Sequence, residues 1–171
     1  MSERDPRWVI EPLSKRHDRA AFSCGVVELD EFLRRYARQN ERIGLGRTFV
    51  ATHESDPHVL GYFTLRTGVV ELEDLPVEET RRFPRYPVPV VHLARLAVDR
   101  SMQGQRLGER LLALALRKAH DASKEIAVYA VEVLAIDDRA KRFYLKYGFK
   151  ELVRDELHLY LPIKTIARLF E

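Results

Sequence analysis

The sequence predicts an α/β fold in which helices flank a mixed, mostly antiparallel sheet. Runs rich in β-branched and aromatic residues alternate with segments whose apolar residues recur at helical spacing, the pattern of a sheet covered by helices. Two of these runs follow one another across a polar turn and predict a hairpin. The chain has 171 residues, of which 46% are hydrophobic and 32% charged. A chain of this size can bury its own core, so we expect a single domain over residues 1–171.

The N-terminal part begins with a strand, a helix and the hairpin. A set of apolar residues at helical spacing predicts the helix: Leu29, Phe32, Leu33, Tyr36 and Ala37. The polar turn of the hairpin contains Asp56 and Pro57. The expected strands are Trp8–Leu13, Thr48–Thr52 and Val59–Leu65.

The middle of the chain contains an irregular segment. Residues 71–89 carry four prolines and several charges, and a long irregular stretch in a small domain is often functional. The sequence leaves open whether Val77–Arg82 is helical. A largely buried strand over Val90–Val98 and a helix over Leu107–His120 follow.

The C-terminal part predicts two further helices and three strands. Gly148 suits the left-handed conformation that ends a helix, so the helix over Asp138–Tyr147 stops there. A short tail helix over residues 163–171 follows Pro162, and it either packs on the sheet or contacts a partner chain. The strands are Ala127–Val133, Phe149–Leu152 and Leu157–Leu161.

Composition excludes several classes of protein. A single cysteine, Cys24, rules out an intramolecular disulfide framework and a multi-cysteine zinc site. The histidines lack the spacing of metal ligands, so we expect no metal. No secretory leader and no membrane-spanning run is visible, which predicts a cytoplasmic protein with no membrane partner. A net charge of +3 permits an anionic partner.

The first candidate site is the sequence Gln103-Gly-Gln-Arg-Leu-Gly108, which joins a strand to a helix. Backbone N–H groups in such a turn can converge on an anion, with the positive end of the helix dipole behind them, so a phosphate is the natural ligand. A tight turn with a structural role alone is the alternative.

The second candidate site is the helix after Asp137. Tyr144 on this helix is either a core aromatic or a proton donor, since an ordinary phenol is protonated at neutral pH. The motif reads Asp137-x-x-Ala140-x-x-Phe143-Tyr144, followed by Gly148-Phe149.

Together these two motifs resemble the GNAT superfamily of acyl-CoA N-acyltransferases. The resemblance implies the GNAT fold, with a splayed central strand that forms the acyl-CoA cleft, and acetyl-CoA as co-substrate. It implies that Tyr144 is the general acid that protonates the departing thiolate after direct attack by an amine. Two departures are Arg106, where a glycine is usual, and Asp137, where asparagine is frequent. The implied cofactor-binding residues are Leu96, Ala97 and Val98 on the strand, Gln103, Gly104, Gln105, Arg106, Leu107 and Gly108 in the turn, and Asp137, Ala140 and Phe143 in the second motif.

Further blocks resemble the toxins of toxin–antitoxin pairs that N-acetylate aminoacyl-tRNA. These blocks include Phe22-x-Cys24-Gly25, Gly61-Tyr-Phe-Thr-Leu65 and Leu93-Ala-Arg-Leu-Ala-Val-Asp99. The resemblance implies that the acceptor is the α-amino group of aminoacyl-tRNA and that translation is inhibited. It also implies a ribbon-helix-helix antitoxin as partner and is compatible with a homodimer.

A tRNA substrate requires cations that contact phosphates. The candidates are Arg38, Arg42, Arg47 and Arg95. The first three are equally consistent with a solvated helix face, and Arg95 with a carboxylate partner inside the sheet. Two other functions stay open: acetylation of a protein amine, a polyamine or another small amine, and a non-catalytic RNA- or partner-binding module.

Overall fold

The computed structural model describes residues 4–5 and 7–170. The chain forms two compact units, the first ending at Arg66 and including Ala94–Ala115, the second comprising Thr67–Leu93 and the chain from Leu116 onward. Strands β4 (Gly61–Val70) and β5 (Val88–Val98) and helix α4 (Leu107–Ser123) each run from one unit into the other.

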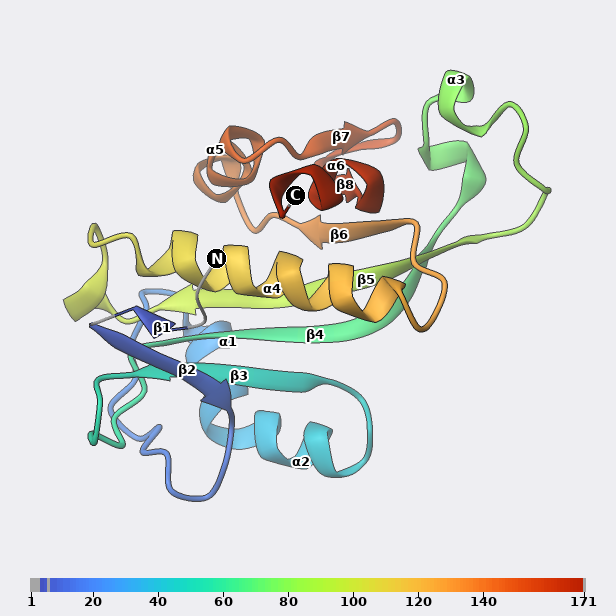
Figure 1. The fold of residues 1–171 in the computed structure, drawn as a ribbon. Helices are drawn as coiled ribbons and strands as arrows, with labels where there is room; N and C mark the ends of the chain where they lie inside the picture. Colours follow the sequence, from blue (N-terminus) through green and yellow to red (C-terminus); the bar gives the residue numbers. More distant parts are fainter. Residues whose placement is uncertain (1–3, 6, 171) are drawn as a thin grey trace. The chain divides into compact units, whose positions relative to one another are not determined.

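The first unit contains an antiparallel run of strands in the order β1-β2-β3-β4 (Figure 1). Val50 of β3 lies opposite Tyr62 of β4, which confirms the predicted hairpin. The buried hydroxyls of Thr48 and Thr64 hydrogen-bond across the same pair at 2.8 Å. The other three strands are β1 (Arg4–Asp5), β2 (Trp8–Pro12) and β3 (Arg47–Thr52).

The predicted N-terminal helix is a continuous helical stretch with a change of winding in its middle. It consists of α1 (Val27–Glu31), a π-helical turn η1 (Phe32–Tyr36) and α2 (Ala37–Arg42). Such π-helical turns are rare and often occur at functional sites. Of the apolar residues that predict the helix, Phe32, Leu33 and Ala37 are buried in the core of the first unit, Leu29 packs against it, and Tyr36 is exposed. This core comprises Leu13, Phe22, Phe32, Leu33, Ala37, Val50, Val59, Tyr62 and Ala97.

The second unit contains the one parallel strand pair described in the chain. Residues Val90–Leu93 of β5 pair in parallel with Ala130–Val133 of β6 (Ala130–Leu134), and β5 then continues to Val98. A parallel connection requires a long crossover, and α4 lies in it. The remaining strands, β7 (Lys150–Leu152) and β8 (Asp155–Pro162), are antiparallel, in the order β5-β6-β8-β7.

The helices of the second unit lie where the sequence predicts them, with ends that differ by a few residues. The irregular segment holds a 3₁₀ turn, η2 (Leu72–Asp74), and a short helix, α3 (Val77–Thr80), which resolves the question left open by the sequence. Helix α5 (Asp138–Lys146) ends before Gly148, which has a φ of +96° as predicted. The tail forms α6 (Ile163–Leu169), and Phe170 after it lies 5.8 Å from the ring of His120 on α4.

The observed architecture confirms the predicted α/β class with its mixed, mostly antiparallel strand pairing. Several predicted boundaries were wrong by one to five residues. β6 begins at Ala130 instead of Ala127, because residues 127–129 run in without strand pairing, and β4 extends to Val70 instead of Leu65. Within the described residues, no helix is both long and apolar enough to cross a lipid bilayer.

Candidate active site

The turn predicted to hold a phosphate lies between β5 and α4 in the first unit. It begins at Asp99, whose carboxylate accepts hydrogen bonds from the backbone N–H of Ser23 at 2.8 Å and of Ser101 at 3.1 Å. Burial alone would raise the pKa of Asp99, but these hydrogen bonds lower it. The side chain of Gln103 then donates to the carbonyls of Cys24 at 2.9 Å and Val98 at 3.0 Å. These contacts tie the first part of the turn to the end of β5 and to residues 23 and 24.

Two residues of this turn have a left-handed backbone. Gly104 has a φ of +81° and Arg106 a φ of +68°. Positive φ costs a residue with a Cβ about 1–2 kcal/mol, so Arg106 occupies a position that favours glycine. A Cβ added at Gly104 would meet no atom within 4 Å, so the space beside this glycine is open. Helix α4 begins directly after Arg106, and the N–H groups of its first turn have no partner within the helix.

Gly61 on β4 lies close both to α4 and to the carbonyl of Ala97, one of the strand residues predicted to bind the cofactor. A Cβ added at Gly61 would lie 2.9 Å from the side chain of Leu111 and 3.1 Å from the carbonyl of Ala97. Ala97 is buried in the core, whereas Leu96 and Val98 are half-buried. The close packing at Gly61 therefore fixes the position of α4, and of the turn that precedes it, relative to residues 94–98 of β5.

The second motif forms helix α5 and lies in the second unit. The side chain of Asp137 caps the helix by accepting from the backbone N–H of Ala140 at 2.8 Å. Tyr144 is 6% exposed, and its ring lies 5.3 Å from that of Phe143 and 5.4 Å from that of Phe149. Burial raises the pKa of Tyr144 above that of an ordinary phenol, so its hydroxyl keeps its proton at neutral pH.

Three of the four predicted tRNA-contacting arginines line a single pocket of the first unit. Its volume is about 540 Å³. Glu41 is the acidic residue among those that line it, and its carboxylate accepts a hydrogen bond from the N–H of Thr48 at 3.1 Å. We call this the basic pocket; it is lined by Leu13, Ser14, Lys15, Arg16, Arg38, Glu41, Arg42 and Arg47.

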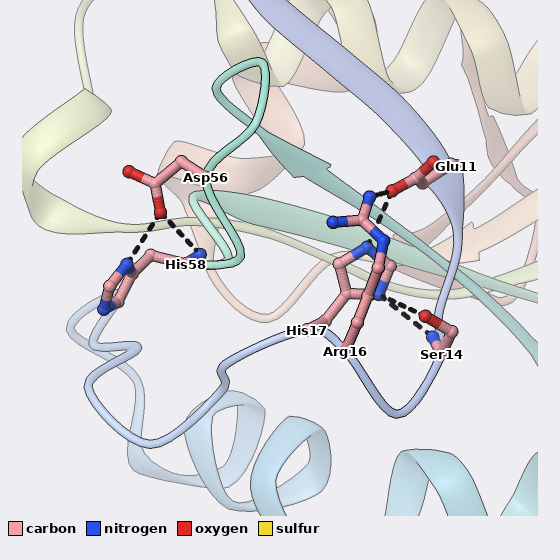
Figure 2. Close-up of polar contacts among 6 residues, drawn as sticks. All are labelled: Glu11, Ser14, Arg16, His17, Asp56 and His58. Atoms are coloured by element: carbon pink, nitrogen blue, oxygen red, sulfur yellow. Dashed lines mark hydrogen bonds and ion pairs between the residues drawn. The ribbon is translucent and has the colours of Figure 1, made fainter.

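Lys15 and Arg16 belong to this pocket although sequence reasoning did not select them. They sit on the turn that follows β2, and the buried ring of His17 holds this turn by contacting Ser14 and Glu11 (Figure 2). Figure 2 also shows a separate pair, in which His58 contacts the carboxylate of Asp56. In the sequence, the only sign of this position is that two basic residues, Lys15 and Arg16, are adjacent.

Two candidate residues lie outside the sites described so far: Arg95, predicted to contact tRNA, and Cys24, the single thiol of the chain. Arg95 lies over the ring of Phe32, 3.6 Å from its centroid, and pairs with no carboxylate among the described residues, so the expected alternative of an ion pair inside the sheet was wrong. Burial and the carboxylate of Asp30 raise the pKa of the Cys24 thiol to about 11, so it is not an activated nucleophile.

Comparison with known proteins relates these features to a family. Residues 16–149 match the acetyltransferase (GNAT) family. A tRNA-acetylating toxin from Mycobacterium tuberculosis is 39% identical over 157 residues, covering 92% of this chain and 93% of that protein. A probable toxin TacT from Sinorhizobium fredii is 31% identical over 170 residues, covering 94% of each.

Solved structures give the same relationship in three dimensions. A tyrosine-to-phenylalanine mutant of KacT matches with a TM-score of 0.92 at 33% identity, covering 96% of this chain and 99% of that one. AtaT complexed with acetyl-methionyl-tRNAfMet matches at 0.90 and 32%, with 96% and 99% covered. A tyrosine-to-phenylalanine mutant of AtaT, bound to the C-terminus of the antitoxin AtaR and to acetyl-CoA, matches at 0.82 and 32%, with 96% and 98% covered.

Proposed function

This chain belongs to the GNAT family of acetyltransferases, and from that premise we propose that it transfers the acetyl group of acetyl-CoA to the α-amino group of aminoacyl-tRNA. Such a reaction blocks translation, because the acylated amino group of the aminoacyl-tRNA cannot attack the ester bond of peptidyl-tRNA. The observation that carries the proposal is the 39% identity to a tRNA-acetylating toxin over 92% of the chain. An enzyme with this substrate acts in the cytoplasm.

The basic pocket supports a polyanionic acceptor. It gathers Arg38, Arg42 and Arg47, and Lys15 and Arg16 add two further cations. Burial and, after it, the charge of Arg38 lower the pKa of Arg19, and Arg16 contacts the carboxylate of Glu11. Phosphate contacts from such residues position a nucleic acid without reading its sequence.

The cofactor assignment rests on residues of the first unit. We assign the pyrophosphate of acetyl-CoA to the backbone of Gln103, Gly104, Gln105, Arg106, Leu107 and Gly108 and the pantetheine arm to the backbone of Leu96, Ala97 and Val98. Open space beside Gly104 and the free N–H groups at the start of α4 suit an anion there. The AtaT structure bound to acetyl-CoA supports the same co-substrate.

In the reaction we assign, a neutral amine attacks the thioester carbonyl directly. The carbon–nitrogen bond forms and the carbon–sulfur bond breaks; the nitrogen loses one proton to solvent, the thiolate of CoA takes one proton, and solvent returns a proton to the donor. Tyr144 is the proposed donor of the proton that the thiolate takes, because its raised pKa keeps the hydroxyl protonated until a basic group arrives. We also assign Asp137, Ala140 and Phe143 to the cofactor site; the side chain of Asp137 caps the helix at the N–H of Ala140, and the ring of Phe143 lies against that of Tyr144.

The similarity to AtaT also supports a protein partner for this chain. The AtaT structure holds the C-terminus of an antitoxin, and we propose that a small ribbon-helix-helix antitoxin binds this protein in a comparable way. A homodimer is compatible with the proposal.

The direct test is incubation of the purified protein with labelled acetyl-CoA and a pool of aminoacylated tRNA. Nuclease digestion and mass spectrometry then identify acetylated aminoacyl-adenosine, and the amino acid that carries the label names the tRNA. Label that appears only on a peptide, polyamine or small-amine panel would assign the enzyme to another acceptor. Binding of tRNA with no affinity for acetyl-CoA would identify a non-catalytic module.

A further inference from the structure

The basic pocket of the first unit is bordered by three segments of the chain, and all three are joined at Thr48. The backbone N–H of Thr48 donates to the carboxylate of Glu41 on α2 at 3.1 Å. Its carbonyl accepts from the N–H of Leu13, which begins the turn after β2, at 2.9 Å. Arg47 precedes Thr48 on β3. The turn, α2 and the start of β3 are therefore held together by hydrogen bonds of the protein itself.

Each of these three segments contributes cations to the pocket. Glu41 is the acidic residue of the lining, and it already accepts the N–H of Thr48. Arg16 contacts the carboxylate of Glu11. The lining cations that pair with no carboxylate among the described residues are Lys15 from the turn, Arg38 and Arg42 from α2, and Arg47 from β3.

This arrangement suits a small anion that carries more than one negative charge. The volume of about 540 Å³ lies in the range of sites for small ligands. Guanidinium groups bind phosphate oxygens through paired N–H donors. A terminal phosphate has three free oxygens and a charge of about −1.5 to −2 at neutral pH. A phosphodiester within a chain offers fewer free oxygens and a single negative charge.

The borders of the pocket also favour a terminal group. A phosphodiester within a chain continues on both sides, so the chain would have to pass out between the bordering segments in two directions. A terminal phosphate is attached on one side and can enter while the rest of the ligand stays outside. We propose that the basic pocket binds a phosphomonoester through Arg42, Arg47 and Lys15.

Two sources supply this group: the 5′ end of a tRNA and a free nucleoside monophosphate. The first source rests on the proposed transfer of acetyl to aminoacyl-tRNA, whereas binding of a phosphomonoester does not. In tRNA the 5′-terminal phosphate belongs to the same acceptor stem as the 3′ end that holds the amino acid. The turn Gln103–Gly108, to which we assign the pyrophosphate of acetyl-CoA, belongs to the same unit as the pocket.

Calorimetry with uridine 5′-monophosphate tests the class of ligand. Excess CoA is present throughout, so that the proposed cofactor site is filled. We expect this monoester to bind at least about tenfold more tightly than uridine 3′,5′-cyclic monophosphate, which carries a diester, and than uridine. Equal affinity for the monoester and the diester would overturn the proposal.

The double variant Arg42→Gln, Arg47→Gln tests whether the monoester lies in the pocket. Two charges are lost while amide donors remain, so the affinity for uridine 5′-monophosphate should fall about tenfold or more. The matched control is Arg35→Gln, because Arg35 is exposed on η1 and does not line the pocket. Urea unfolding reports whether each variant is folded. Wild-type affinity in a folded double variant would place the monoester elsewhere and overturn the proposal.

Glu41→Gln gives a change in the opposite direction. The amide oxygen can still accept from the N–H of Thr48, but the negative charge beside the anion is gone. The affinity for uridine 5′-monophosphate should therefore rise by up to about fivefold. A role of Glu41 in holding the fold alone predicts no rise, and an unchanged or weaker affinity in this variant would count against an anion in the pocket.

Charged tRNA decides between the two sources. The same tRNA is aminoacylated with its 5′-phosphate, after removal of that phosphate by phosphatase, and after its restoration by a kinase. If the pocket holds the 5′ end, KM for acetylation should rise about tenfold without the phosphate and recover with it, while kcat stays unchanged. An unchanged KM together with tight binding of the monoester assigns the pocket to a free nucleotide. If no tRNA is acetylated at all, the proposed acceptor is wrong, and calorimetry still decides what the pocket binds.

Discussion

The buried imidazole of His17 accepts a hydrogen bond from the backbone N–H of Ser14, with 3.0 Å between that nitrogen and Nδ1. An accepting nitrogen carries no proton, so the proton of this ring lies on Nε2, which donates to Glu11 at 2.9 Å (Figure 2). Both contacts together require the neutral imidazole. They hold the turn that brings Lys15 and Arg16 to the basic pocket.

His17 should make folding stability depend on pH in a defined direction. Burial and the charge of Arg16 lower its pKa in the folded protein below the ordinary 6.5, so the unfolded chain takes up the proton more readily. The neutral ring makes its full contribution to the free energy of unfolding above about pH 6.5. That contribution is lost as the pH falls toward the pKa of His17 in the folded protein. Urea unfolding at a series of pH values should show this loss, and His17→Gln should lack it.

His58 provides a control of opposite sign. Contacts with Asp56 raise its pKa, so any contribution it makes is present below about pH 6.5 and disappears as pH rises through the raised value. His58→Gln should therefore leave the acid-side loss intact. If the free energy of unfolding of the wild type does not decline below about pH 6.5, His17 does not stabilise the fold as a neutral imidazole.

Arg106→Gly should stabilise the fold. Glycine adopts the observed φ of +68° without the steric cost that a Cβ imposes, although it is more flexible in the unfolded chain. We expect a gain of up to about 1 kcal/mol in the free energy of unfolding. Gln105→Gly is the matched control, because Gln105 is not among the described residues with positive φ, and it should not stabilise. Chemical denaturation of both variants gives the comparison.

Removing charge from the basic pocket should weaken tRNA binding by an electrostatic route. Each phosphate contact contributes about 0.7–0.9 to the slope of log affinity against log salt concentration. The triple variant Arg38→Ala, Arg42→Ala, Arg47→Ala should lower that slope by about 2 to 3 and leave acetyl-CoA affinity unchanged. The control removes three arginines of the irregular segment, Arg81, Arg82 and Arg85. Equal effects of the two sets would mean that the pocket is no specific site.

Tyr144→Phe separates chemistry from binding. The substitution removes the hydroxyl and keeps the ring contacts with Phe143 and Phe149, so we expect folding and acetyl-CoA affinity near those of the wild type. Turnover should fall about 10²-fold or more. Gly108→Leu should do the reverse and raise the Kd for acetyl-CoA, measured by calorimetry. Wild-type turnover in Tyr144→Phe would remove Tyr144 from the acid role.

Glu79 should anchor the irregular segment. Its carboxylate accepts hydrogen bonds from the hydroxyls of Tyr129 and Tyr160 and from Nζ of Lys150 at 3.2 Å. Glu79→Leu leaves these donors without a carboxylate and should lower the free energy of unfolding by about 1–3 kcal/mol. Glu78→Leu on the same short helix is the control, since Glu78 is exposed. Hydrogen exchange should show earlier opening of α3 in the first variant only.

Sequence alone determined the class of fold and the order of its elements. The hairpin, helix α4 and the end of α5 at Gly148 follow from local rules, because hydrophobic period and a residue that tolerates positive φ act over a few neighbours. The motifs at Gln103–Gly108 and around Tyr144 were recognisable for the same reason. Boundaries were less certain, as the late start of β6 at Ala130 shows, since strand pairing decides where a strand begins.

Only the tertiary structure determined which distant side chains meet. The sequence leaves open whether Arg38, Arg42 and Arg47 form a solvated helix face or a nucleic-acid surface. They line one pocket with Lys15 and Arg16 because His17 holds the turn that carries those two residues. His92, Glu132 and His158 are far apart in the chain and carry no shared motif. They meet because strand register places them on one face, and register is set by many pairings at once, which no local pattern encodes.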